Sequence, residues 1–162
     1  MRSRFKREDG AAAVEFALIV GVLTMLIFGM IEYGIFFLQA QTLRAGARGG
    51  ARQAAVGATK SQIDKAVVDA SGGSLPSGYS ADTVTVNGNA FSGTGAPCTS
   101  STYGQNVTVT IPVTSSSLPS SVLDAFRIDI PFIPTLYPYG NPASNSSSSS
   151  PITGTFRCEI SS

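Results

Sequence analysis

The sequence predicts an α+β protein: a long N-terminal helix, first transmembrane and then a stalk, followed by a small domain with a helix packed on an antiparallel sheet. Three observations predict it. Residues 11–31 are almost all apolar, with a single charge, and as a helix they would be about 31 Å long, enough to cross a bilayer. Apolar residues between positions 63 and 70 recur at helical spacing. Residues 107–113 and 152–160 alternate apolar and polar side chains, as strands do.

Charge is sparse and unevenly placed. Only 13% of the 162 residues are charged and 43% are hydrophobic, whereas soluble proteins usually carry about 25% charged residues. The formal net charge is +1, so no bulk electrostatic argument points to nucleic acid as a partner. The first ten residues hold four basic side chains, so the positive-inside rule predicts that residues 1–10 stay in the cytoplasm and that the domain at 58–162 is exported.

Glu15 is the feature that a plain membrane anchor does not explain. A charge inside an inserting helix is unfavourable and is usually kept for function. If the chain is cut between Gly10 and Ala11, a new terminal amine forms and Glu15 becomes the fifth residue, about 6 Å further along the helix. In a packed array of helices, this carboxylate can then face the amine of a neighbouring subunit, and the pair favours one register.

Residues 7–16, Arg-Glu-Asp-Gly-Ala-Ala-Ala-Val-Glu-Phe, resemble the prepilin-peptidase site of the Flp/Tad subfamily of type IV pili. That subfamily is cut after glycine and keeps glutamate at the fifth mature position, followed by an aromatic residue, here Phe16. Residues 28–34 and 45–52 resemble the TadE-like pseudopilins, with a Glu-aromatic-Gly step at Glu32-Tyr33-Gly34 and an Ala-Arg-x-Gly-Ala-Arg-like stretch. The resemblance departs at Ile35, where the family often has a basic residue, and at Gly49-Gly50, where one glycine replaces a commoner acid.

The resemblance implies a structural subunit with a type IV pilin-like fold, not an enzyme, and no cofactor. It implies a precursor in the cytoplasmic (inner) membrane, surrounded by lipid, whose 1–10 leader is removed by a prepilin peptidase. The helix at 11–57 would then join other pilin subunits in a cell-surface pilus that supports adhesion. The implied partners also include the Tad inner-membrane platform and the assembly ATPase. The long domain favours a minor pilin or pseudopilin, although a reduced pilus can use a longer subunit as its main building block.

The stalk predicted at 32–57 carries three arginines on one face, at Arg44, Arg48 and Arg52, because they are spaced by four residues. They form either a solvated stripe or a contact with acidic groups of neighbouring subunits or lipid headgroups. Glu32 is either an interfacial charge in water or a contact with a partner pilin. Three glycines lower helix propensity here, which indicates close packing against another backbone or a local bend: they are Gly46, Gly49 and Gly50.

The exported domain is expected to begin where Gly57-Ala58 ends the long helix. Residues 59–62 have the form of a capping box, and the apolar face of the helix that follows is expected to cover the sheet. Pro112 implies that the strand at 107–113 either lies at an edge or ends there. The other expected segments are a strand at 83–86, a loop at 87–102, a strand at 127–133, a loop at 134–142, a disordered serine-rich loop at 144–150 and the last strand at 152–160.

Two cysteines, Cys98 and Cys158, both follow the membrane segment. An even count on the exported side favours a disulfide, and the alternative is two buried free thiols. The chain has no histidine, which excludes Ser-His-Asp and Cys-His sites and leaves too few ligands for zinc. The carboxylates show no metal-loop spacing.

The hypothesis that competes with a pilin is an uncleaved single-pass membrane protein whose exported domain binds a ligand. The aromatic segment at 132–139 is its candidate surface.

Overall fold

The computed structural model describes residues 8–80, 82–113, 129 and 151–160. The segments predicted at 134–142 and 144–150, the aromatic segment at 132–139 and all of the strand predicted at 127–133 except Asp129 lie outside the described residues. So do residues 1–7 of the predicted leader.

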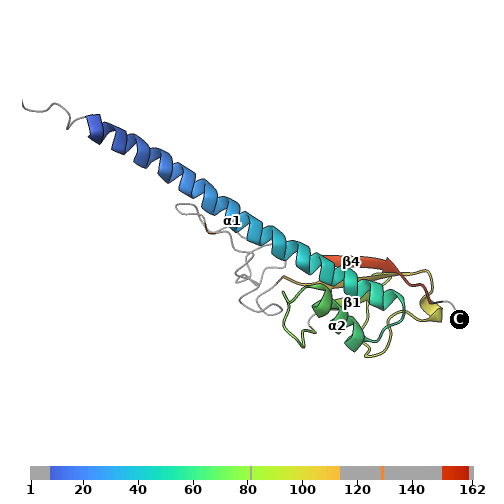
Figure 1. The fold of residues 1–162 in the computed structure, drawn as a ribbon. Helices are drawn as coiled ribbons and strands as arrows, with labels where there is room; N and C mark the ends of the chain where they lie inside the picture. Colours follow the sequence, from blue (N-terminus) through green and yellow to red (C-terminus); the bar gives the residue numbers. More distant parts are fainter. Residues whose placement is uncertain (1–7, 81, 114–128, 130–150, 161–162) are drawn as a thin grey trace, which may run out of the picture.

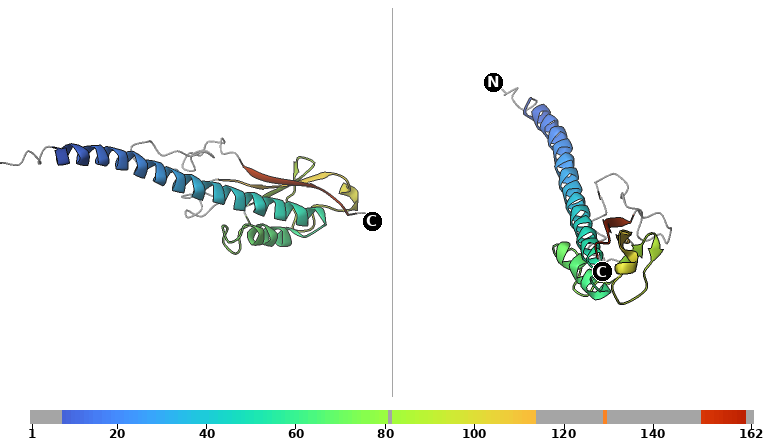
Figure 2. Two further views of the ribbon diagram at one scale, coloured as in Figure 1. Left: turned by 45° about the horizontal axis from the view of Figure 1, so that its top comes forward. Right: turned by 90° about the vertical axis from the view of Figure 1, so that its right-hand side faces the viewer.

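The architecture is α+β, as predicted. A long helix α1 (Glu8–Ala55) is followed by a short helix α2 (Lys60–Ala70) and a four-stranded antiparallel sheet. The strands lie in the order β2-β1-β3-β4, with bounds Asn89–Ala90, Thr83–Val86, Asn106–Ile111 and Ile152–Arg157. The first part of α1 projects as a bare rod, and its last part lies within the head formed by α2 and the sheet (Figures 1 and 2).

Helix α1 has 48 residues and is therefore about 72 Å long. It ends in a Schellman motif, in which Gly57 adopts a positive φ of 82°. The Gly57 N–H donates to the Ala54 carbonyl, and the Ala58 N–H donates to the Gln53 carbonyl, each at 3.1 Å. Helix α2 begins with the predicted capping interaction, since the Thr59 N–H donates to Gln62 Oε1 at 2.9 Å.

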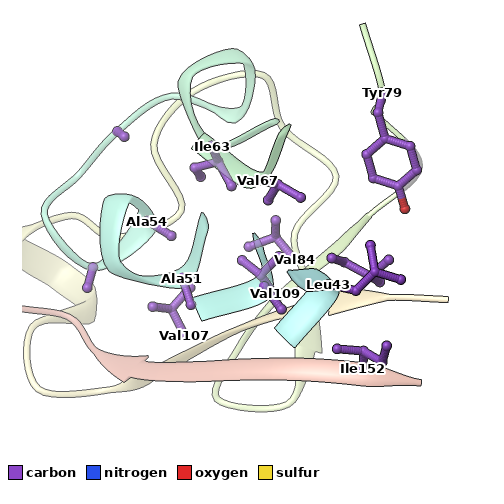
Figure 3. Packing of buried hydrophobic residues seen from close by; sticks show 14 of the residues in the cluster. Leu43, Ala51, Ala54, Ile63, Val67, Tyr79, Val84, Val107, Val109 and Ile152 are labelled. Atoms are coloured by element: carbon purple, nitrogen blue, oxygen red, sulfur yellow. The ribbon is translucent and has the colours of Figure 1, made fainter. Parts of the chain in front are cut away.

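The end of α1 is the middle layer of the head. Figure 3 shows Ala51 and Ala54 of α1 between Ile63 of α2 and Val107 of β3. Residues 40–55, which we predicted as part of a stalk, thus contribute to the centre of the core. The expectation that α2 covers the sheet was wrong, because α2 packs on α1, and α1 in turn covers β3 and β4. The buried apolar side chains include Leu43, Ala47, Ala51, Ala54, Ile63, Val67, Val84, Val107, Val109, Ile111 and Ile152.

Glycines allow both contacts of the middle layer. A Cβ on Gly49 would lie 2.6 Å from the Ala70 Cβ, and one on Gly46 would lie 2.9 Å from the Val67 carbonyl oxygen. A Cβ on Gly50 would overlap the Val67 side chain. On the opposite side, a Cβ on Gly154 of β4 would overlap the backbone of α1 at Ala47. Of the two interpretations of the α1 glycines, close packing is therefore confirmed.

The strand predicted around residue 109 is central, not an edge strand. Val109 pairs with Val84 of β1 on one side and with Gly154 of β4 on the other. The strand ends at Ile111, before Pro112, because proline has no N–H to donate to a ladder. The last strand also ends earlier than predicted, at Arg157.

Two short elements occupy the segment predicted as a loop at 87–102. Strand β2 pairs with β1 through a turn at Asn87-Gly88, where both residues have positive φ, 49° and 82°. Asn-Gly between two strands is a strong hairpin signal, and our interpretation of the sequence missed it. A single 3₁₀ turn, Ser100–Thr102, precedes β3.

The disulfide is confirmed. Cys98 and Cys158 are bonded, with Cα atoms 5.5 Å apart, and both are buried. The bond links the segment after β2 to the end of β4 across 60 residues of chain.

Candidate assembly surface

The first half of α1 exposes a continuous apolar surface. From Gly10 to Leu38 every side chain is exposed or half-buried, and none is buried. Within the described residues, α1 is the one helix long and apolar enough to cross a membrane. An exposed apolar surface of this size requires lipid or another apolar partner, because in water it would aggregate. The exposed large apolar side chains include Val14, Leu18, Ile19, Val22, Leu23, Leu26, Phe28 and Ile31.

Glu15 is the one acid on this surface between Gly10 and Ile31. It lies one helical turn after the Gly10–Ala11 bond, which is itself in the first turn of α1. Glu15 is exposed and makes no ion pair with any residue that the structure describes, and the neighbouring Phe16 is 68% exposed. The geometry leaves the carboxylate available to a group outside this chain.

Glu32 and Tyr33 lie where α1 approaches the head. The Tyr33 ring is 6.5 Å from the Phe37 ring, nearly parallel to it, and 6.2 Å from the Phe36 ring. Glu32 is half-buried, and the residue four positions later is Phe36, so no intrahelical salt bridge accounts for the charge. By helical geometry, Tyr33 and Phe37 lie about 100–140° around the axis from Glu32, whereas Phe36 lies on the same side of the helix as Glu32.

The three arginines lie on the face of α1 that points away from the core. Arg44, Arg48 and Arg52 are all exposed, whereas Leu43 and Ala47 on the opposite face are fully buried. Arg52 lines the groove between α1 and α2 together with Asp69. The structure thus collects the arginines into one stripe on the back of the head, distant along the helix from Glu15.

Our interpretation of the sequence missed a partly buried polar cluster around Lys60. Lys60, at the start of α2, makes ion pairs with Asp64 and with Asp82, the latter at 2.9 Å. The Lys60–Asp64 pair has the i,i+4 spacing that sequence reasoning can find. Asp82 is 22 positions away and comes into contact only through the fold. The Tyr79 hydroxyl and Asp82 Oδ2 are buried without a hydrogen-bond partner among the described residues.

Burial and the ion pairs with Lys60 together set the pKa values in this cluster. Burial raises the pKa of Asp82 to about 6, against the opposing effect of the Lys60 hydrogen bond. Burial also raises the pKa of Tyr79, and the negative charges of Asp82 and Asp64 act in the same direction. Burial alone would lower the pKa of Lys60, but its hydrogen bonds to Asp64 and Asp82 outweigh that effect and raise it. The cluster fastens α2 to the start of β1, beside an open pocket of about 610 Å³.

Helix α1 thus has a bare apolar half with one early acid, followed by a half with small residues that packs in the core. Residues 10–52 match the family model of TadE-like protein. No curated protein and no solved structure matches the chain. The match confirms the resemblance drawn from residues 7–56. It lies wholly within α1 and leaves α2 and the sheet outside.

The matched segment contains all the predicted cleavage and assembly residues: Gly10, Ala11, Glu15, Phe16, Glu32, Tyr33, Arg44, Arg48 and Arg52. Their roles in cleavage and assembly stay predictions. The structure does not bring Glu15 near the arginines within one chain, because one long continuous helix separates them. Any contact between these two groups of residues must therefore involve separate copies.

Proposed function

We propose that this chain is a pilin-type structural subunit of a Tad/Flp-type pilus. It is made as a single-pass membrane precursor with residues 1–10 in the cytoplasm and the head exported. A prepilin peptidase cuts between Gly10 and Ala11. The mature chain then joins other pilin subunits through the bare half of α1, with the help of the Tad membrane platform and assembly ATPase.

One observation supports this proposal most directly: the only ionisable side chain between Gly10 and Ile31 is Glu15, exposed one turn after Gly10. As a permanent anchor, the helix would keep an unfavourable charge in lipid with nothing to pair it. After cleavage, the Ala11 amine of a neighbouring copy supplies the missing positive charge. The pair then offsets the cost of both groups in an apolar array.

The architecture supports the same function. The head folds around residues 40–55 and leaves the first half of α1 uncovered, so the helix is available first to lipid and then to other subunits. The TadE-like match covers this helix. The disulfide suits an exported head, since such bonds persist outside the cytoplasm.

The N-terminus of the protein tests the proposal. We expect mass spectrometry of the chain from cells that contain a prepilin peptidase to show a first residue of Ala11. In peptidase-deficient cells, the same chain should keep its leader. A Gly10→Leu variant should also keep it, while remaining in the membrane. An unprocessed chain in peptidase-containing cells would instead favour the competing hypothesis of an uncleaved anchor with an exported binding domain.

A further inference from the structure

Glu32 lies on α1 two turns before Ala40, the first buried residue of the helix. The arginine stripe, which includes Arg48, lies further along the same helix, on the face of α1 that points away from the core. Glu32 and Arg48 are sixteen positions apart, which is about 24 Å along the helix axis and about 160° around it. Within one straight helix they cannot meet. Neither makes an ion pair with any residue that the structure describes.

Two parallel helices that lie side by side contact each other through faces about 180° apart, since each must turn a face to the other. Glu32 lies on the side of α1 that continues into the buried face of the head, where Gly50 and Leu43 are found, whereas Arg48 lies on the back. The acid of one copy and the arginine of another are thus on faces that meet when the helices run in the same direction.

The size of the head gives the same displacement. The fully buried positions of α1 run from Ala40 to Ala55, which is also a stretch of sixteen residues, and Phe36 packs partly against the same core. Consider a second copy shifted by this length toward the N-terminal end of the first. The buried stretch of its α1 then follows directly on that of the first copy along the axis, and its Arg48 is level with Glu32 of the first copy. The Ala11–Glu15 pair between neighbouring copies requires an offset of four residues, which is about 6 Å. The Glu32–Arg48 offset of sixteen residues is four times as long. An array that rises by about 6 Å per copy therefore allows both pairs, the second between copies that are four steps apart.

We propose that Glu32 of one copy binds Arg48 of a second copy that is displaced by about sixteen residues along α1. The inference rests on the proposed pilin function. The contact is heterologous, with different surfaces on the two copies, and such contacts propagate into open filaments. The guanidinium group and the carboxylate can form paired hydrogen bonds, which specify the register of the two helices.

Lipid headgroups are a poor alternative partner for Arg48. If the span ends near Ile31, Arg48 lies about 25 Å beyond it along an upright helix. The headgroup layer on each side of the hydrocarbon core is only about 5–8 Å thick. In two copies at equal depth in the membrane, Glu32 and Arg48 are also about 24 Å apart. The pair therefore forms only when one copy has been drawn outward relative to the other.

Cross-linking in the full-length chain tests this register. The variant Glu32→Cys/Arg48→Cys, treated with a short thiol-specific bifunctional reagent, should give a ladder of multimers in sheared filaments and none in the membrane fraction. Each single variant should give no ladder. The matched control is Glu32→Cys/Gln41→Cys, because Gln41 is exposed on the same back face but about 10 Å lower along the helix. A ladder from the control that equals or exceeds that of the test variant would overturn the proposal.

A charge exchange provides a second measurement. Glu32→Arg and Arg48→Glu should each lower the filament yield about fivefold or more at an unchanged membrane level, and the double variant should restore it. No restoration, together with no ladder, would overturn the register while leaving the pilin function intact. If wild-type cells make no filament that contains this chain, and it keeps its leader, the proposed function itself fails and this inference with it.

Discussion

Both halves of α1 contain glycines, and these glycines lie in very different surroundings. At Gly46, Gly49 and Gly50, an added Cβ would collide with α2. At Gly21 and Gly29, it would meet nothing within 4 Å. Each glycine costs roughly 1 kcal/mol of helix propensity relative to alanine. In the second half that cost is offset by packing within the chain, whereas in the first half no residue that the structure describes packs against these glycines.

The largest effect on the head should come from filling the contact between α1 and α2. Gly50→Leu forces Val67 and Ile63 away and should destabilise the head by about 3 kcal/mol or more, lowering its Tm by on the order of 10–20 °C. The matched control, Gly21→Leu, should leave the Tm unchanged and affect filament yield alone. Thermal unfolding in detergent, followed by near-UV circular dichroism, measures both. Equal Tm values for the two variants would remove the contrast between the halves.

The disulfide should have the next largest effect. Replacing Cys98 and Cys158 together with serine opens a loop of 60 residues and should cost about 2–4 kcal/mol. Reduction of the wild-type protein should lower the Tm by the same amount, which separates loss of the bond from any effect of the new hydroxyls. A Tm that neither treatment changes would show that the core alone holds the end of β4 in place.

A smaller, pH-dependent effect should come from Asp82. Its pKa is about 6 in the folded chain and 3.8 in the reference state, so between these values the folded state holds a proton that the unfolded state has lost. This group therefore adds stability as the pH falls from about 7 to about 4. Asp82→Asn should reduce the rise in Tm between pH 7 and pH 5 by on the order of 5 °C. An identical rise in both proteins would contradict this assignment.

The smallest effect on the head should come from Glu15, which lies in the bare half. Glu15→Gln keeps the shape of the side chain and removes its charge. The free energy of unfolding of the head should therefore stay within about 0.5 kcal/mol of the wild-type value. Filament yield should fall strongly, because the Ala11 amine of a neighbour then lacks its counter-charge. Normal filaments from this variant would show that charge pairing does not set the register.

Patterns among neighbouring residues predicted most of the helices and strands correctly. The apolar helix, the capping box at Thr59 and the strands around Val84 and Val109 each follow from patterns of neighbouring residues, and the structure contains all of them. The hairpin at Asn87-Gly88 was equally local and was overlooked. The packing partner of α2 could not be predicted from the residues of α2 alone. Its amphipathic pattern shows which face is buried, but an apolar face fits a helix as well as a sheet.

Contacts between distant positions were beyond the reach of sequence patterns. Gly154 approaches the backbone of Ala47 more than a hundred residues earlier, and Asp82 reaches Lys60 across the turn that follows α2. Both contacts depend on how the helices and strands pack against one another in the folded chain. The exposure of the three arginines belongs here too, because their shared face follows from spacing, whereas only the packing of the opposite face determines that it points outward.

By itself, the sequence determined that a long apolar helix with one early acid precedes a small α+β head, because helical period and strand alternation are properties of neighbouring residues. Only the tertiary structure decided that the end of this helix is the middle layer of the head, and that the face carrying Arg48 points away from the core. Layer order and surface placement depend on contacts among elements far apart in the chain, and no short stretch of sequence contains both partners.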